Sequence, residues 1–239
     1  MEQVRSNRKG AKLRISEIYS SLQGEGLLTG TPSVFVRASG CNLRCWFCDT
    51  PFASWYPEGS YYSVGEILTQ VAERHTGHVV LTGGEPFIFA NLHELCHGLR
   101  SAGEHLTIET AGTIYQRLEC DLISISPKLS GSAPDASHGS WQQTHNQRRQ
   151  RLDIVRKLMA EHPYQLKFVV DNPSDAQEML GYLLELGPYD GQRVLVMPQG
   201  TQQAELERQA GWLIPWCQQY GLQFCPRAHI AWYGNLRGT

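Results

Sequence analysis

Short apolar runs alternate with longer amphipathic segments along most of the chain. Runs rich in β-branched and aromatic residues, bounded by Gly, Pro or Asn, predict strands at residues 33–38, 78–81, 106–110, 122–126, 165–170 and 193–197. Helical periodicity covers the segments at residues 63–75, 91–101, 144–161, 174–186 and 201–220. Strands that alternate with helices predict βαβ units and a mainly parallel α/β sheet, which is either doubly wound or an incomplete (β/α) barrel.

The ends of these segments carry further signals. Ser63 is followed three residues later by Glu66, the pattern of a capping box, and Pro163 stands just after a predicted helix. Residues 130–140 are rich in Ser, Gly, Ala and Pro and predict a loop over the sheet edge. Residues 222–239 lack a helical period but hold several aromatic side chains, so we expect this segment to pack down near the site.

Polar and glycine-rich residues follow the predicted strands. They form the segments at residues 40–41, 82–86, 109–112, 126–128, 171–172 and 197–199. In open α/β folds the chemistry collects at the carboxyl ends of parallel strands. We therefore expect these segments to converge on one rim.

The composition is that of a globular chain. Of 239 residues 41% are apolar and 18% are charged, which is enough to bury a core in one domain spanning residues 1–239. No apolar run suffices to cross a membrane, and the polar start lacks a secretory signal, so we expect a cytoplasmic protein. The net charge of −2 gives no overall electrostatic attraction to nucleic acid or to a membrane, so we expect neither as a partner. A flexible tail over about residues 1–12 is predicted from the basic residues Arg5, Arg8, Lys9, Lys12 and Arg14.

Three of the seven cysteines lie close together in C-x3-C-x2-C spacing, as Cys41, Cys45 and Cys48. Thiolates at this spacing can hold a soft metal centre. A structural zinc site normally has four ligands, and no fourth is evident nearby, whereas a [4Fe–4S] cluster held by three cysteines leaves one iron open. Three alternatives stand at this point: an iron–sulfur cluster, a zinc site completed by a distant ligand, and three buried thiols. The adjacent Trp46 and Phe47 are expected to shield a cluster from water.

A second motif, GGEP at residues 83–86, follows the next predicted strand. Together with the cysteine spacing, it resembles the radical S-adenosylmethionine (SAM) superfamily. The resemblance implies a [4Fe–4S] cluster on the three cysteines, SAM chelating the open iron, and the GGEP backbone binding the amino group of SAM. One-electron reduction would then cleave SAM to methionine and a 5′-deoxyadenosyl radical.

Further segments narrow the resemblance. They are SLQGEG at residues 21–26, FVR at 35–37, CDT at 48–50, IETAGT at 108–113, SISPK at 124–128, LKFVV at 166–170 and H-x-x-W-x-G-N-x-R-G at 229–238. From residue 13 onward the chain resembles the 7-carboxy-7-deazaguanine synthase family. This implies an incomplete (β/α)6 barrel that converts 6-carboxy-5,6,7,8-tetrahydropterin to 7-carboxy-7-deazaguanine with loss of ammonia, on the route to queuosine-type bases. It also implies regeneration of SAM, a Mg²⁺ ion, an electron donor such as flavodoxin, and a homodimer.

The resemblance assigns roles to individual positions. Substrate-binding positions match Leu22, Gln23, Gly24, Arg37, Thr82, Glu109 and Thr239. Among them, Arg37 is expected to meet the substrate carboxylate and Glu109 the pterin N–H groups. SAM-binding positions match Phe47, Cys48, Asp49, Gly84, Ser126, Pro127, Lys128, Met197 and Gln199, and Thr50 matches the Mg²⁺ ligand. No side chain is expected to be catalytic by itself, because SAM carries the radical.

Two other functions remain as alternatives. Within the superfamily, the chain could be an activase that generates a glycyl radical on a partner protein. In a different class, it could be a non-catalytic zinc-binding module. His229, the first residue of the C-terminal motif, is as consistent with a histidine packed in the core as with a residue of the site.

Overall fold

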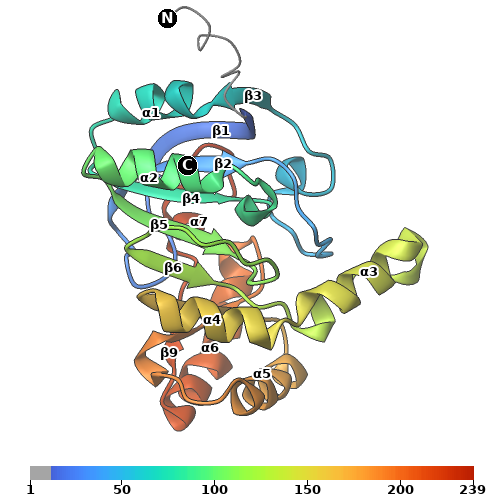
Figure 1. The fold of residues 1–239 in the computed structure, drawn as a ribbon. Helices are drawn as coiled ribbons and strands as arrows, with labels where there is room; N and C mark the ends of the chain where they lie inside the picture. The colour runs from blue at the N-terminus through green and yellow to red at the C-terminus, as the bar shows by residue number, and fades with distance from the viewer. Residues whose placement is uncertain (1–11) are drawn as a thin grey trace, which may run out of the picture.

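The computed structural model describes residues 12–239, which are built around one sheet (Figure 1). In spatial order the described strands are β3 (Ser60–Ser63), β1 (Lys12–Leu22), β2 (Pro32–Ala38), β4 (His78–Gly83), β5 (His105–Thr110), β6 (Leu122–Ile125), β7 (Tyr164–Val170), β8 (Val194–Pro198) and β9 (Gln223–Phe224). Strand β1 is antiparallel to β2 and β3, and every neighbouring pair from β2 to β9 is parallel.

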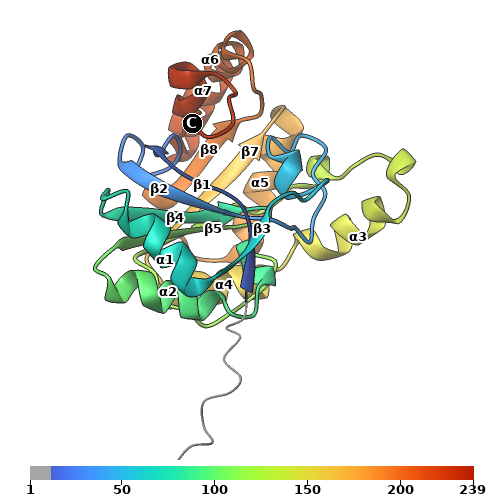
Figure 2. The same ribbon diagram turned by 90° about the horizontal axis from the view of Figure 1, so that it is seen from above.

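The order of the parallel strands decides between the two predicted architectures. From β2 to β8 they follow one another in chain order, whereas a doubly wound sheet reverses its order at a switch point. Sequential strands with right-handed crossovers place their connecting helices on the same side of the sheet, and Figure 2 shows the curved arrangement that results. In the described residues β3 and β9 do not pair with each other, so the fold is the predicted incomplete barrel.

Local signals mark several of the helix ends. They are α1 (Val64–Ala72), α2 (Leu92–Ser101), α3 (Ser140–Arg149), α4 (Leu152–Glu161), α5 (Pro173–Leu186), α6 (Gln203–Tyr220) and α7 (Ala228–Tyr233). Ser63 and Glu66 form the predicted capping box at the start of α1. The side chain of Asn172 accepts hydrogen bonds from the first turn of α5, and Gly221, whose φ of +66° is left-handed, caps the end of α6.

The principal core lies between the sheet and these helices. Val79 and Leu81 of β4 are buried together with Ile108 of β5, against Leu95 of α2 and Leu158 of α4 in the same cluster. Nearly every residue of β4, β6 and β8 is buried, because these parallel strands are covered on both faces. This packing fixes the carboxyl ends of the strands at one edge.

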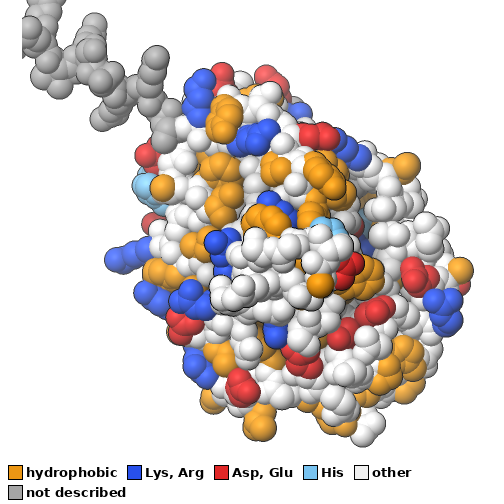
Figure 3. Space-filling model, turned by 90° about the vertical axis from the view of Figure 1, so that its right-hand side faces the viewer, with side chains coloured by type: hydrophobic (Ala, Val, Ile, Leu, Met, Phe, Trp, Pro, Cys, Tyr) orange, Lys and Arg blue, Asp and Glu red, His pale blue; other side chains and the backbone are white. Residues whose placement is uncertain are grey.

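On the face drawn in Figure 3, basic and acidic side chains are interspersed and form no large patch of one charge. Over the described residues, no helix is both long and apolar enough to cross a membrane.

Most predicted elements are confirmed. The six predicted strands correspond to β2 and β4 to β8, and four of the predicted helices correspond to α1, α2, α5 and α6. Their ends differ from the predictions by no more than three residues. The apolar runs and caps that define them are local signals, which sequence patterns capture directly.

The prediction of one helix over residues 144–161 is wrong. The chain leaves the helical conformation at Gln150 and Arg151, which separate α3 from α4. Helix α3 buries only His145 and projects from the body of the molecule, whereas α4 buries Ile154, Val155 and Leu158 against the sheet (Figure 1). The two segments therefore have different surroundings, and only α4 has an apolar face that packs on the core.

The N-terminal prediction is wrong for two of its basic residues. Lys12 and Arg14 belong to β1, and the guanidinium of Arg14 donates a hydrogen bond of 2.8 Å to the backbone carbonyl of Pro57. Strand β1 was not predicted, because its stability comes from antiparallel pairing with β2 and β3 rather than from an apolar run. Arg5, Arg8 and Lys9 lie outside the described residues.

The C-terminal segment is more regular than predicted. It forms β9 beside β8 and the short helix α7, although its sequence has no helical period. The backbone N–H of Ala228 donates to the carbonyl of Gly24, 2.9 Å away, so α7 begins against the loop after β1. Such long-range contacts stabilise the segment without leaving a pattern in its sequence.

Candidate functional site

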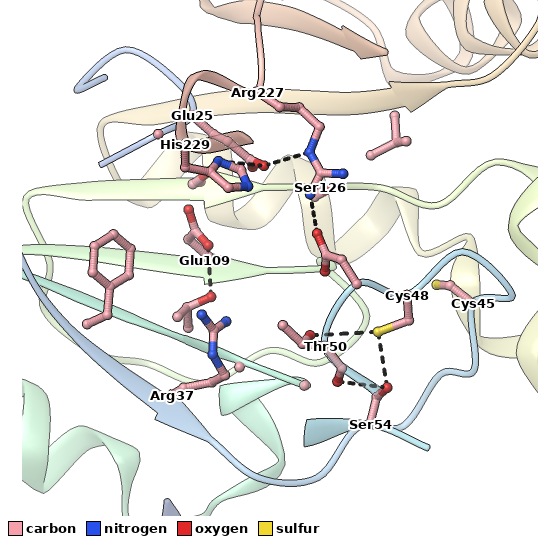
Figure 4. A pocket seen from close by; sticks show the side chains of 18 of the residues that line it. Glu25, Arg37, Cys45, Cys48, Thr50, Ser54, Glu109, Ser126, Arg227 and His229 are labelled. Carbon is pink, nitrogen blue, oxygen red and sulfur yellow. Dashed lines mark hydrogen bonds and ion pairs between the residues drawn. The ribbon is translucent and has the colours of Figure 1, made fainter. Parts of the chain in front are cut away.

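The carboxyl ends of the parallel strands surround one pocket of about 340 Å³ (Figure 4). The predicted rim is confirmed for the segments that follow β2, β4, β5, β6 and β8, which all contribute to the lining, whereas Asp171 and Asn172 after β7 do not line the pocket. The predicted site residues in the lining are Leu22, Gln23, Gly24, Arg37, Cys41, Cys45, Phe47, Cys48, Asp49, Thr50, Thr82, Gly84, Glu109, Ser126, Lys128, Met197, Gln199 and Thr239. Pro127 departs from the prediction, because it is buried behind the lining.

Two glycines let the end of β4 meet the cysteine loop. A Cβ atom at Gly84 would lie 2.1 Å from the carbonyl oxygen of Gly40 and 2.6 Å from that of Ala53. Gly83 has a φ of +138°, and a Cβ atom there would lie 2.1 Å from the carbonyl oxygen of Ala38. Only glycine fits these contacts, so the GGEP motif sets the distance between the two strand ends.

The glutamate of the GGEP motif has a structural role in this protein. Glu85 is fully buried and accepts hydrogen bonds from the hydroxyl of Thr110 and the N–H of Ala111, both at 2.8 Å, and from the N–H of Phe87 at 3.1 Å. Burial raises the pKa of Glu85, and these hydrogen bonds oppose the rise. The carboxylate therefore joins the end of β4 to the end of β5 rather than facing the pocket.

The three cysteines of the loop after β2 are free thiols that line the same pocket. The loop is held from both sides: Trp55 donates to the carbonyl of Cys45 at 2.9 Å, and Ser54 lies 3.1 Å from the sulfur of Cys48. Burial raises the pKa of Cys41 and of Cys45 to about 12. A metal centre bound here would have to displace their protons.

The donor set fits a cluster better than a single metal ion. Within residues 12–239, no group of three or more His, Cys, Asp or Glu side chains is arranged to hold one ion. A zinc ion needs all of its ligands at about 2.0 to 2.3 Å, whereas each cysteine of a [4Fe–4S] cluster binds a different iron. Three thiols that share a pocket without converging on one point therefore suit the larger cluster.

The outer wall of the cysteine loop is built by α3 and the turns before it. Buried His145 accepts from the backbone N–H of Arg44 at 3.1 Å, and the Arg44 guanidinium lies 4.1 Å from the ring centroid of Trp141. Trp46 donates 2.7 Å to the carbonyl of Gly131 and is 53% exposed. Of the two aromatic residues expected to shield a cluster, Phe47 lines the pocket, while Trp46 attaches the loop to Gly131 and Ser132.

Arg37 is held at the end of the pocket by two neighbours from β1. Its Nε donates to Glu17 at 2.6 Å and its Nη2 donates to the Tyr19 hydroxyl at 2.8 Å. Tyr19 stacks on Phe35, with ring centroids 5.1 Å apart. The guanidinium is therefore fixed in direction and can present its remaining donors to an anion.

Glu109 stands at the end of β5 with its carboxylate toward the pocket (Figure 4). Thr82 donates to one of its oxygens at 2.8 Å, and Gln23 donates to the other at 3.5 Å. Lys167 of β7 lies 3.5 Å from the same second oxygen. This oxygen has only long contacts with the protein and can accept a hydrogen bond from a ligand.

A network of charged side chains in the pocket was not predicted from the sequence. Lys167, only 6% exposed, lies 2.6 Å from Glu25, and Arg227, 7% exposed, lies 3.3 Å from Glu25. Arg227 also forms an ion pair with Asp49. Lys167 stands inside the apolar run LKFVV, and a lysine in a buried strand is a usable signal of a paired charge.

His229 takes part in the pocket rather than in the core. It lines the cavity, and its Nδ1 lies 3.9 Å from Glu25. Burial lowers the pKa of His229, although Glu25 opposes this shift. A Cβ atom on Gly24 would lie 2.5 Å from the His229 ring, which explains the glycine at this position of the QGEG segment.

The opposite wall carries the remaining predicted SAM contacts. The ammonium of Lys128 donates to the backbone carbonyl and to the hydroxyl of Ser126, both at 2.7 Å. Gln209 of α6 donates to the carbonyl of Gln199 at 2.8 Å and so holds the turn after β8. Thr50 lies on the cysteine side, with its hydroxyl 3.7 Å from the sulfur of Cys48.

The last residues of the chain close one side of the pocket. Residues 235–239 line it, and Arg237 donates to Glu17 at 3.1 Å and to Glu58 at 2.9 Å. The Arg237 guanidinium also lies 3.9 Å from the ring centroid of Phe52. Thr239 therefore reaches the pocket, as predicted for a residue near the substrate.

Comparison with known proteins gives consistent results. The family model described as the radical SAM superfamily matches residues 35–166. The 7-carboxy-7-deazaguanine synthase of Rhodopirellula baltica is 47% identical over 96% of this chain and 90% of the relative, and that of Halobacterium salinarum is 42% identical over 96% and 94%. The crystal structure of QueE from Escherichia coli superposes with a TM-score of 0.67 over 91% of this chain and 95% of that chain, at 23% identity, and so shares the fold.

Proposed function

The chain belongs to the 7-carboxy-7-deazaguanine synthase family of the radical SAM superfamily, and on this premise we propose how its pocket performs the reaction. The enzyme is a lyase that converts 6-carboxy-5,6,7,8-tetrahydropterin to 7-carboxy-7-deazaguanine with loss of ammonia. The observation that carries this function is the one pocket in which three free thiols, a fixed arginine and an accessible carboxylate meet. These groups suit the cluster, the carboxylate of the substrate and its pterin ring.

Cys41, Cys45 and Cys48 would hold the [4Fe–4S] cluster of the family. When bound, the cluster and SAM supply a 5′-deoxyadenosyl radical that takes a hydrogen atom from C6 of the pterin. Phe47 lines the pocket beside these thiols and would exclude water from a bound cluster. The loop is fixed by Trp55 and Ser54, so its three thiols keep their relation to the strand ends.

Arg37 would bind the substrate carboxylate. Glu17 and Tyr19 already use its Nε and one Nη2 hydrogen, so the orientation of the guanidinium is set before a ligand arrives. A positively charged fork of fixed direction suits a planar carboxylate. This contact would place the pterin with its C6 side toward the cysteine loop.

Glu109 would recognise the other end of the substrate. Its carboxylate can accept hydrogen bonds from the 2-amino group and the ring N–H of a pterin. Thr82 fixes one oxygen, which leaves the second oxygen to the ligand. Leu22, Gln23, Gly24 and Thr239 complete the lining on this side.

The SAM side would be formed by the segment 47–49, Gly84, Ser126, Lys128 and the turn at 197–199. Lys128 can pair with the carboxylate of SAM, and the backbone at Gly84 can approach a ligand because no side chain covers it. Thr50 would contribute a hydroxyl oxygen to a Mg²⁺ ion, which prefers oxygen ligands. Within the described residues no compact carboxylate group for a single ion is present, so substrate and water would supply the other ligands.

Two partners belong to this proposal. Cleavage of SAM requires one electron, for which a flavodoxin is the expected donor. We also propose that the chain forms a homodimer, as is expected for the family.

Anaerobic turnover tests the function. The reconstituted protein is incubated with carboxytetrahydropterin, SAM, reductant and Mg²⁺, and the product is identified by mass and ultraviolet absorbance. We expect a deazaguanine, with SAM recovered. Failure of the iron-loaded protein to consume the pterin would contradict the proposal, and stoichiometric zinc in a colourless protein would support the zinc-module alternative.

A further inference from the structure

A chain of alternating charges lines the pocket from the proposed SAM side to the proposed substrate side, and Figure 4 labels its members Arg227, Glu25 and Glu109. It runs from Asp49 through Arg227, Glu25 and Lys167 to Glu109. We propose that Arg227 is a positioning residue that couples the two binding sites, so that SAM is cleaved productively only when the pterin is correctly placed. This inference rests on the proposed function.

Arg227 joins three separate segments through its three nitrogen atoms. Nε donates to Glu25 in the loop after β1 at 3.3 Å, and Nη1 donates to the carbonyl of Gly200 after β8 at 2.5 Å. Nη2 donates to Asp49, which follows the last cysteine of the loop. One planar side chain therefore fixes the relative position of the cysteine loop, the turn after β8 and the QGEG segment.

The far end of this series of charges is Glu109, the carboxylate proposed to bind the pterin ring, which is reached through Lys167. The Lys167 ammonium is 2.6 Å from Glu25 and 3.5 Å from Glu109. Glu25 thus holds Lys167 closely and keeps it from a short ion pair with Glu109. The Glu109 carboxylate stays accessible to a ligand because Lys167 is paired closely with Glu25.

Charge balance shows why Arg227 is needed for this arrangement. This series of five charged residues contains three carboxylates, of Asp49, Glu25 and Glu109, and two cations, Lys167 and Arg227. Burial alone would raise the pKa of Glu25, but Lys167 and Arg227 hold it well below its usual range. Without Arg227, Glu25 keeps Lys167 and the imidazole of His229, which is a cation only when protonated, and Asp49 loses its ion pair.

A purely structural ion pair would not have these consequences. All five charged residues line the cavity. The ion pair with Arg227 is what connects Asp49 to the other charged residues of this series. A change at Arg227 should therefore be felt on both sides of the pocket. Misplacement of the two ligands relative to each other would release 5′-deoxyadenosine without product.

The test uses the full-length, cluster-loaded protein and the variants Arg227→Gln and Arg227→Lys. The matched control is Arg151→Gln, which removes an exposed arginine paired with Asp153 outside this pocket. Three quantities are measured: the Kd for SAM by equilibrium dialysis, the KM for carboxytetrahydropterin, and the moles of 5′-deoxyadenosine released per mole of product. We expect Arg227→Gln to raise each quantity by about tenfold or more, because removal of one partner from a buried charge pair is costly. Arg227→Lys should restore part of the loss, and the control should match the unchanged protein.

A second variant keeps the test decisive if Arg227→Gln does not fold. Asp49 is 38% exposed, so Asp49→Asn is expected to fold, and its effect on the substrate side passes through Arg227. The inference predicts a higher KM for the pterin in Asp49→Asn as well as a higher Kd for SAM. A change in only one of these values, or a ratio of 5′-deoxyadenosine to product equal to that of the unchanged protein, would overturn it. Lack of pterin turnover by the unchanged protein would instead contradict the proposed function.

Discussion

Several charged side chains of the pocket are almost fully buried, which is unusual for charged residues. Lys167, Arg227 and Glu25 are each at most 14% exposed, and each has an oppositely charged partner within 3.3 Å. Buried ions cost several kcal/mol unless they are paired and hydrogen-bonded. A protein that needed only a stable barrel would be served by apolar residues here, so these charges indicate a site for polar ligands.

Replacement of a cluster cysteine should abolish the metal centre. For Cys41→Ala, Cys45→Ala or Cys48→Ala we expect iron content to fall from about four atoms per chain to near zero, because each thiolate holds a different iron. Iron and sulfide analysis with the visible absorbance of anaerobic protein measures this. Cys120→Ala is the control, since Cys120 lies outside the pocket lining. Retention of a full cluster by any of the three variants would refute the ligand assignment.

Neutralising Glu109 should impair substrate use more than SAM binding. In Glu109→Gln we expect kcat/KM for the carboxypterin to fall about tenfold to a hundredfold, as hydrogen bonds to a charged group are worth about 1.5 to 3 kcal/mol. The Kd for SAM should stay unchanged, and 5′-deoxyadenosine should appear without product. Steady-state kinetics decide the matter, with exposed Glu207→Gln as the control. Unchanged kinetics would remove Glu109 from the site.

At the scale of elements, the junction of β4 with the cysteine loop is the tightest approach in the site. Gly84→Ala would place a methyl group 2.1 Å from a backbone oxygen, which cannot move as a flexible side chain can. We expect a loss of about 1 to 3 kcal/mol of unfolding free energy and a lower iron content. Gly65→Ala is the matched control, because nothing lies within 4 Å of its added methyl group in α1. It should leave stability equal or raise it by up to about 1 kcal/mol.

Stability should depend on pH through the link between β2, β4 and β5. Buried His78 contacts Ser33 at 2.8 Å and Thr107 at 2.9 Å, and burial together with nearby His105 lowers its pKa from 6.5 to about 4. The unfolded chain therefore binds a proton on this histidine at a higher pH than the folded protein does. Its contribution is complete above about pH 6.5 and is lost as the pH falls to about 4, by on the order of 2 to 3 kcal/mol.

Denaturant unfolding across this pH range measures the effect of His78. In His78→Gln the slope of unfolding free energy against pH between 6.5 and 4 should be smaller than in the unchanged protein, because the group that titrates is gone. Equal slopes in the two proteins would show that His78 does not control the acid sensitivity.

For the whole molecule, closure of the pocket joins the two ends of the described chain. Glu17 of β1 accepts from Arg37 and from Arg237, so the substrate arginine and the C-terminal segment share one carboxylate. In Arg237→Gln we expect the KM for the carboxypterin to rise about two- to fivefold, since exposed ion pairs are worth up to about 1 kcal/mol each. The Kd for SAM should not change, because Arg237 contacts the substrate side.

Substrate kinetics and SAM binding, measured side by side, test the closure. Arg193→Gln is the control, because Arg193 pairs with Asp190 on the surface. A larger effect on SAM than on the pterin would contradict the role given to the C-terminal segment.

Local chemistry made much of the site predictable. The cysteine spacing, the GGEP turn and the strand ends are contiguous motifs, and the structure places them around one pocket. Glu25 lay within a recognised segment, yet its partners Lys167 and Arg227 stand 142 and 202 residues away in the sequence. Pairings over such separations leave no local pattern, so the charge network was not predicted.

The sequence by itself determined the parallel strands, most of the helices and the residues of the cysteine loop, because these depend on periodicity, caps and spacing within short segments. Tertiary structure decided the open barrel, the antiparallel β1 and the break between α3 and α4, since each depends on which distant segment packs alongside. It alone placed Arg227 between Asp49 and Glu25. The physical reason is that a buried charge is stable only beside its partner, and the fold determines which residue that partner is.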